Sequence, residues 1–191
     1  MKLVAAALPA LLATFVACGP EAPPPKKPEA PAVASGSDVE RYFPLEQGKL
    51  YHYVTREGAD EGMLVAKVHR TDAKHGELRL SNSTKRFVYA SDGVTYDTGI
   101  YVLRAPVAVG TSWPGEHGGT TRIAAVDVSV TVPAGTYASC VQTVEEGGRV
   151  PGARYQQTYC PGVGMVLLEA TAPGAEARAE LKRYGLPVKI E

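Results

Sequence analysis

The chain has 191 residues, with 20 lysines and arginines against 20 aspartates and glutamates, so its formal net charge at pH 7 is zero. No basic cluster is interleaved with aromatic residues, which argues against a nucleic acid partner. About 150 residues follow a proline-rich segment near the start, enough for one domain with a real core and too few for two well-filled ones.

The chain begins like a bacterial signal peptide. Lys2 precedes an uncharged, apolar run over residues 3–17, which is the usual layout of such a segment. A helix that crosses the hydrocarbon core needs about 20 residues, so this run is too short for a permanent transmembrane segment. We therefore expect residues 1–17 to be removed.

The end of this run, Phe15-Val16-Ala17-Cys18, resembles the bacterial lipobox. Its small residue before the cysteine fits the motif, whereas Phe15 stands where leucine is usual. In lipoproteins of this kind the cysteine receives a diacylglyceryl group and the new amino terminus is usually acylated as well, and two or more chains anchor a protein stably. The resemblance implies lipidation at Cys18 and the membrane as a partner. The alternative is an ordinary signal peptide with an incidental cysteine.

Residues 18–38 form a proline-rich linker with almost nothing that could build a core. Polyproline II rises ~3.1 Å per residue, so the linker can hold a domain up to roughly 60 Å from the bilayer. A spacer is the favoured interpretation, and a ligand for a proline-recognising module is the alternative. Gly19 and Pro20 follow Cys18, with no aspartate next to the anchor. By resemblance to enterobacterial sorting this points to the outer membrane, facing the periplasm or the cell surface.

From residue 39 onward, apolar and polar residues alternate. In the clearest case the even-numbered residues of 124–132 are apolar, as in a half-buried antiparallel strand or a bent strand pair. Similar runs lie at 49–56, 63–70, 77–81, 85–90, 100–104, 137–145, 154–160, 164–169 and 177–184. The intervals are too short for crossover helices. The sequence predicts an all-β domain over 39–191, an antiparallel meander of about ten short strands in a curved sheet or open barrel. Residues 175–181 have good helix propensity but are interpreted as a strand.

Cys140 and Cys160 form an even pair once Cys18 is assigned to the lipid, as expected in an oxidising compartment. A hairpin centred near Val150 places them directly opposite each other, within reach of a disulfide. A redox dithiol is disfavoured because the chain has no Cys-x-x-Cys motif.

Two segments that enter strands echo each other, Pro-Leu-Glu-Gln-Gly-Lys-Leu-Tyr at 44–51 and Pro-Val-Ala-Val-Gly-Thr-Ser-Trp at 106–113. Each copy is predicted to open one half of the domain, and the alternative is coincidence or a common way to enter a strand. Two turn motifs follow, Val-Pro-Ala-Gly-Thr-Tyr at 132–137 and Pro-Gly-Val-Gly at 161–164. This combination resembles uncharacterised bacterial envelope proteins with β domains, many of them lipoproteins. Because these motifs shape turns, the resemblance implies a fold and no reaction.

Residues suited to catalysis or metal binding are scattered. A zinc site would need assembly by the fold, because no metal-binding spacing includes the histidines His52, His69, His75 and His117. Asp92 and Asp97 bracket a turn but lack the other ligands of a calcium loop. We therefore predict no catalytic residue, no metal and no cofactor. An enzyme would gain support if the fold brought histidines and carboxylates together in one cleft.

Two functions remain. The first is a noncatalytic binding or assembly module whose partner is an envelope protein or a cell-wall component. The alternative is a carrier of a lipid or other apolar ligand, because a curved sheet can form an apolar trough. The aromatic residues suited to line it are Tyr51, Tyr53, Phe87, Tyr89, Tyr101 and Trp113. The competing interpretation is that they fill the core.

The lipidation site yields the first prediction. The substitution Cys18→Ser is expected to abolish incorporation of a fatty-acid probe and to leave an uncleaved or soluble precursor, because the acyl group has no acceptor. Radiolabelling of cells, with the unsubstituted chain as the positive control, measures this. Labelling that survives the substitution would sink the lipoprotein assignment.

Overall fold

The computed structural model describes residues 38–187, which belong to one compact unit. The signal peptide, Cys18 and nearly all of the linker therefore lie outside the described residues. Within 38–187, no helix combines the length and the apolar character needed to span a bilayer.

A single turn of 3-10 helix, η1 (Glu40–Tyr42), precedes twelve strands. The first six strands are β1 (Leu50–Glu57), β2 (Asp60–Arg70), β3 (His75–Arg79), β4 (Thr84–Ala90), β5 (Gly93–Tyr96) and β6 (Tyr101–Arg104). The remaining six strands are β7 (Ser112–Pro114), β8 (Thr120–Val132), β9 (Gly135–Glu146), β10 (Arg154–Cys160), β11 (Gly164–Ala172) and β12 (Ala175–Gly185).

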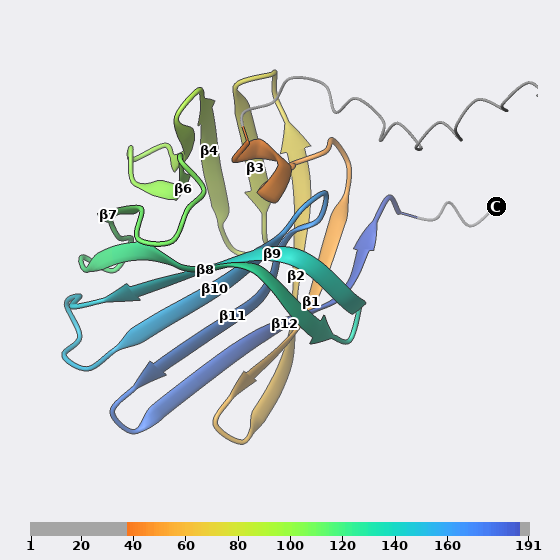
Figure 1. Cartoon of the computed structure of the whole chain (residues 1–191). Helices are drawn as coiled ribbons and strands as arrows, with labels where there is room; N and C mark the ends of the chain where they lie inside the picture. The colour runs from red at the N-terminus through yellow and green to blue at the C-terminus, as the bar shows by residue number, and fades with distance from the viewer. Residues whose placement is uncertain (1–37, 188–191) are drawn as a thin grey trace, which may run out of the picture. The chain divides into compact units, whose positions relative to one another are not determined.

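All twelve strands form one antiparallel sheet in the order β6-β5-β4-β3-β2-β1-β12-β11-β10-β9-β8-β7. The sheet curves into an open barrel with β6 and β7 as its edges (Figure 1). A side chain links these edges, because the Trp113 Nε1–H donates to the Tyr101 carbonyl oxygen at 2.9 Å. The predicted all-β curved sheet or open barrel is confirmed. The two strands beyond the expected ten are β5 and β7, which are too short to show alternation.

The two echo segments occupy equivalent places, one before β1–β6 and the other before β7–β12. In the first copy, the Gly48 N–H donates to the Val68 carbonyl oxygen at 3.2 Å, and in the second the Gly110 N–H donates to the Ile123 carbonyl oxygen at 2.9 Å. Both glycines have positive φ, +82° and +91°, which other residues adopt only at a cost. The shared hydrogen bond supports the interpretation that each copy opens one half of the domain.

Strand β8 changes the face that it buries. Thr121 and Ile123 are buried at its start, whereas over residues 126–132 the even-numbered side chains are the less exposed ones. Pairing with β9 is irregular at three points in between, and Asp127 has a φ of +54°. Such bulges bend a strand and move its side chains to the opposite face. The segment is therefore the bent strand that the alternation allowed.

The bend carries the β8–β9 hairpin across β10, β11 and β12 (Figure 1). At its tip the Ala134 N–H donates to the Leu181 carbonyl oxygen of β12 at 2.9 Å. Near the base of this extension, β9 and β10 pair Val141 with Tyr159. Cys140 precedes Val141, and Cys160 follows Tyr159. The two cysteines are joined by a disulfide, with their Cα atoms 4.2 Å apart.

The register of β12 explains why a segment with high helix propensity is a strand. Its alanines at 175, 177 and 179 lie on one face and its charged residues at 176, 178 and 180 on the other. Ladders on both sides, with β1 and with β11, satisfy its backbone. Tertiary pairing therefore overrides a helix preference of a few tenths of a kcal/mol per residue.

The disulfide yields a stability prediction. Because the two cysteines are 20 residues apart, closing this loop is expected to contribute about 3 kcal/mol to the free energy of unfolding. The double substitution Cys140→Ala, Cys160→Ala should lower that free energy by a similar amount in urea denaturation. Reduction of the natural chain is the matched comparison. Two free thiols in the unreduced, unfolded domain, beyond any at Cys18, would show that the pair is not linked.

Candidate functional site

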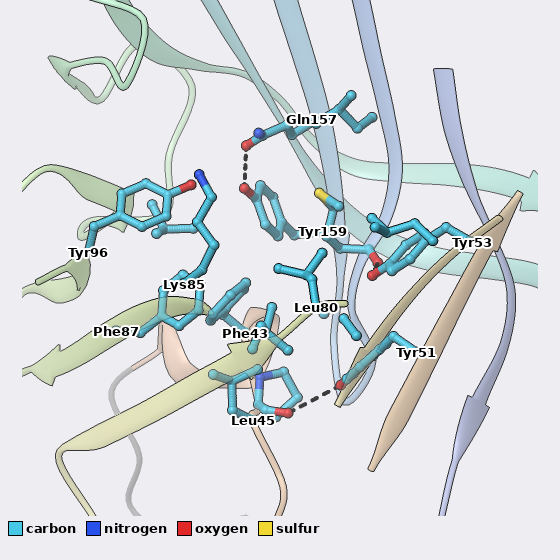
Figure 2. A pocket seen from close by; sticks show the side chains of 18 of the residues that line it. Phe43, Leu45, Tyr51, Tyr53, Leu80, Lys85, Phe87, Tyr96, Gln157 and Tyr159 are labelled. Atoms are coloured by element: carbon cyan, nitrogen blue, oxygen red, sulfur yellow. Dashed lines mark hydrogen bonds between the residues drawn. The ribbon is translucent and has the colours of Figure 1, made fainter. Parts of the chain in front are cut away.

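A cavity of about 190 Å³ lies inside the barrel between β1–β4 on one side and β10–β11 on the other (Figure 2). The segment that precedes β1 closes one end of it through Phe43, Pro44 and Leu45. Aliphatic side chains contribute much of the remaining lining: Leu64, Ala66, Leu78, Leu80, Val102, Met165 and Leu168. Phe43 and Leu45 are buried, whereas the Lys85 and Glu116 side chains, which also line the cavity, are 48% and 32% exposed. The cavity is thus an apolar pocket with a buried end and a mouth.

Two of the tyrosines in the wall, Tyr51 and Tyr53, have their hydroxyl groups hydrogen-bonded to the backbone. Tyr51 Oη donates to the Val163 carbonyl oxygen at 2.8 Å, and Tyr53 Oη donates to the Met165 carbonyl oxygen at 2.9 Å. Burial raises the pKa of both phenols well above the ordinary value. Because a buried hydroxyl with a partner makes no further demand on its surroundings, these two rings act as apolar surface.

Three of the six aromatic residues proposed for an apolar face, Tyr51, Tyr53 and Phe87, line this pocket. The other three lie elsewhere. Tyr89 is buried and donates to the Phe43 carbonyl oxygen at 2.8 Å, the buried Trp113 closes the barrel edges, and Tyr101 borders a small second cleft and donates to Asp92. The aliphatic lining was not predicted. Its alternation on the predicted strands, as in Leu64 with Ala66 and Leu78 with Leu80, is the signal that could have found it.

Polar groups gather at the mouth, on the side formed by β4, β5, β10 and the β7–β8 turn. Lys85 Nζ donates to one oxygen of Glu116, and Tyr96 Oη donates to the other at 2.7 Å. Tyr159 Oη donates to Gln157. Figure 2 shows Tyr96, Gln157 and the end of the Lys85 side chain at the opposite end of the pocket from Leu45. The pocket is therefore apolar within and polar along one side of its rim.

The charge state of the rim follows from these contacts. Burial works to raise the pKa of Glu116, but the hydrogen bonds from Lys85 and Tyr96 outweigh it, and the pKa lies below its ordinary value. Burial raises the pKa of Tyr96, and nearby Tyr159 and Glu116 raise it further. At neutral pH the rim therefore holds a carboxylate paired with an ammonium group and a neutral phenol.

A buried carboxylate holds the turn that carries Glu116. Glu145 accepts hydrogen bonds from the His117 N–H at 2.8 Å and the Gly119 N–H at 3.0 Å, and it lies 3.0 Å from His117 Nδ1. A Cβ on Gly115 would stand 2.1 Å from the Glu145 carboxyl carbon, so a larger residue there would displace this carboxylate. The His117 ring also stacks on Tyr155, with 3.5 Å between ring centres.

The fold thus brings His117, Glu116 and Glu145 to one small cleft, an arrangement that the sequence did not predict. Glu145 is the buried acceptor of two turn N–H groups, so its contacts are explained by the structure of the turn. The other candidates do not join this cleft: Asp92 accepts from Tyr101, Asp97 lies 3.8 Å from Arg86, and His75 forms a separate pair with Asp72. Within residues 38–187, no three His, Cys, Asp or Glu side chains are placed to hold a metal ion.

Comparisons with known proteins place the fold. No protein-family model matches the sequence, and no curated protein matches it significantly. One similar structure is a "putative exported protein with YmcC-like fold" from Bacteroides fragilis, with a TM-score of 0.51, 10% identity, and coverage of 74% of this chain and 97% of that one. A second is a "putative lipoprotein" from Parabacteroides distasonis, with a TM-score of 0.45, 13% identity, and coverage of 78% and 100%. The first comparison shows a shared fold.

The buried tyrosines yield a prediction for alkaline pH. Burial raises the pKa of Tyr51, Tyr53, Tyr89, Tyr96 and Tyr159 above the ordinary value of about 10. Their contribution to stability is therefore complete below about pH 10 and declines above it, because the unfolded chain then releases protons that the folded domain keeps. Each such tyrosine should lower the free energy of unfolding by ~1.4 kcal/mol per pH unit.

Ultraviolet titration of the phenols, followed together with circular dichroism, measures this. These five of the ten tyrosines should ionise only as the sheet unfolds, whereas the denaturant-unfolded chain should ionise all ten in one step near pH 10. Ionisation of all ten at that pH in a domain that remains folded would contradict the burial of these phenols.

Proposed function

We propose that this protein is a lipid-anchored component of the bacterial cell envelope whose β domain is a noncatalytic module that binds an apolar ligand in the pocket. The Cys18 lipobox resemblance and the proline-rich spacer support the envelope location. The exported character given for the similar Bacteroides fragilis structure is consistent with that location. An apolar ligand in the pocket is also in keeping with a protein held near a membrane, where acyl chains are abundant.

The proposal rests on one observation, that the hydroxyl groups in the pocket wall already have hydrogen-bond partners within the protein. An apolar cavity of about 150 Å³ in another protein stays dry and binds benzene, and the present cavity is somewhat larger at about 190 Å³. Because the Tyr51 and Tyr53 hydroxyl groups have backbone partners, water gains little from entering. An apolar group of roughly six to eight carbons therefore fits the space and gains the most from it.

A docking module for an envelope protein or a cell-wall component is the second candidate. Met63 and Val65 lie on one face of β2, on the side opposite Leu64 and Ala66, which line the pocket, and their residues are 64% and 37% exposed. Native mass spectrometry of protein released from membranes separates the two candidates, because a bound apolar molecule is expected only for the first. Recovery of one specific envelope protein after cross-linking, with an empty pocket, would favour the second.

Filling the pocket should abolish binding. We expect 1-monooctanoylglycerol to bind the domain in isothermal titration calorimetry, and the substitution Leu168→Trp to weaken that binding at least tenfold, because the larger side chain takes the ligand's space. The matched control is Val109→Trp, at a residue 63% exposed in the second echo segment, outside the pocket lining. Equal binding by both variants, or no binding by the natural chain, would contradict the proposal.

A further inference from the structure

We infer that the ligand is an amphiphile with one linear acyl chain that is longer than the pocket, so that the chain leaves through the mouth and continues along a trough on the same face of the sheet. This inference rests on the proposed function and names the class of its ligand. The end of the chain lies in the closed pocket, and the remaining carbons lie on the trough.

The trough is an open groove of about 320 Å³ between the β1–β2 and β11–β12 hairpins. Its floor consists largely of small side chains, including Ala170, Ala172, Ala175 and Ala177. Ala170 and Ala177 are direct cross-strand partners in the β11–β12 ladder. Because alanines leave the backbone surface low, a chain one methylene wide can lie against the sheet there.

The pocket and the trough adjoin on two neighbouring strands. On β11, Leu168 lines the pocket and Ala170 lines the trough, and on β10 the corresponding residues are Gln157 and Tyr155. Residues two apart on a strand share a face and lie about 6.6 Å apart. A chain that leaves the pocket over Leu168 therefore reaches the trough without crossing to the other face of the sheet.

Charge decides which side of the mouth a methylene chain takes. On one side stands the Lys85–Glu116 pair, whose desolvation by an apolar chain would cost free energy. On the other side lie the alanines, while the charged residues of β12, Glu176, Arg178 and Glu180, alternate onto the opposite face. The apolar route out of the pocket is thus the trough.

One aromatic side chain borders this route. Tyr155 lines the trough, and the stacked ring of His117, itself held by Glu145, fixes its position. The histidine and carboxylate pair therefore positions a wall of the ligand path. At the far end the trough meets the exposed residue Glu57, the cross-strand partner of Ala177, whose charge disfavours a negatively charged head group nearby.

The length of the trough sets the length of the chain. From Leu168 to Ala172, β11 advances about 13 Å at ~3.3 Å per residue. An extended chain advances ~3.5 Å for every three single bonds, so this distance corresponds to about eleven bonds. The closed pocket holds roughly six to eight carbons. A chain of about eighteen carbons would therefore fill both sites. A chain of twelve to fourteen carbons reaches from the pocket onto the trough, whereas one of eight carbons occupies the pocket alone.

A chain-length series tests this inference in the full chain. The probes are 1-monoacylglycerols with eight, ten, twelve and fourteen carbons, each below its critical micelle concentration and measured by isothermal titration calorimetry. A fully buried methylene strengthens binding ~fourfold, so one covered on a single side should contribute roughly twofold. Affinity is expected to keep rising from eight to fourteen carbons, by about 60-fold in total at that increment.

The substitution Ala177→Asp places a charge on the trough floor and should remove this rise while leaving binding of the eight-carbon probe unchanged. Its matched control is Ser129→Asp, at an exposed position of β8 that borders neither the pocket nor the trough. An affinity that levels off after eight carbons in the natural chain would overturn the long-chain inference and leave the proposed function standing. Absence of binding by every probe would overturn both.

Discussion

Pairing of the first strand with the last is the constraint on which the rest of this domain depends. β1 and β12 pair from Leu50 opposite Gly185 to Glu57 opposite Ala177, and each half of the domain then extends outward from this joint as a meander. Contacts so distant in the chain carry a large loop-closure cost. The buried bonds from Tyr51 and Tyr53 to carbonyl groups at Val163 and Met165 reinforce the joint, and they make the same wall apolar toward the pocket.

A second polar group, the Glu145 carboxylate, orders the turn at the open end of the barrel. The buried Glu145 carboxylate satisfies backbone N–H groups in the β7–β8 turn, and Gly115 leaves room for it in this position. The turn then presents Glu116 to Lys85 at the mouth of the pocket and His117 to Tyr155 beside the trough. Removing the carboxylate would leave buried donors without partners, at a cost of about 1–3 kcal/mol each. One buried group thus orders both borders of the candidate site.

The shared fold with a protein of 10% identity shows that this sheet tolerates almost complete replacement of its side chains. In this chain the sheet is built on alternation, with Gly48 and Gly110 in positive φ in the two segments that enter its six-stranded halves. The pocket asks for more, because its apolar character needs every phenol in its wall to find a partner. Likeness of fold therefore carries no ligand with it, and the ligand has to be argued from the residues of this chain.

Alternation in the sequence determined the strands, including β12 against its helix propensity, and the spacing of turn residues determined a register that sets Cys140 opposite Cys160. These are local properties, decided within a strand or a hairpin. The pocket was decided by the tertiary structure. Alternation shows which aromatic residues face inward, but only the curvature of the sheet decides which of them border a cavity. Tyr51 and Tyr53 then border a cavity, whereas Tyr89 and Trp113 are packed within the core. The pair Lys85 with Glu116 joins the two halves of the sheet, and only its curvature brings them into contact. The pair His117 with Glu145 depends on the register of the β8–β9 ladder, where Thr121 lies opposite Glu145.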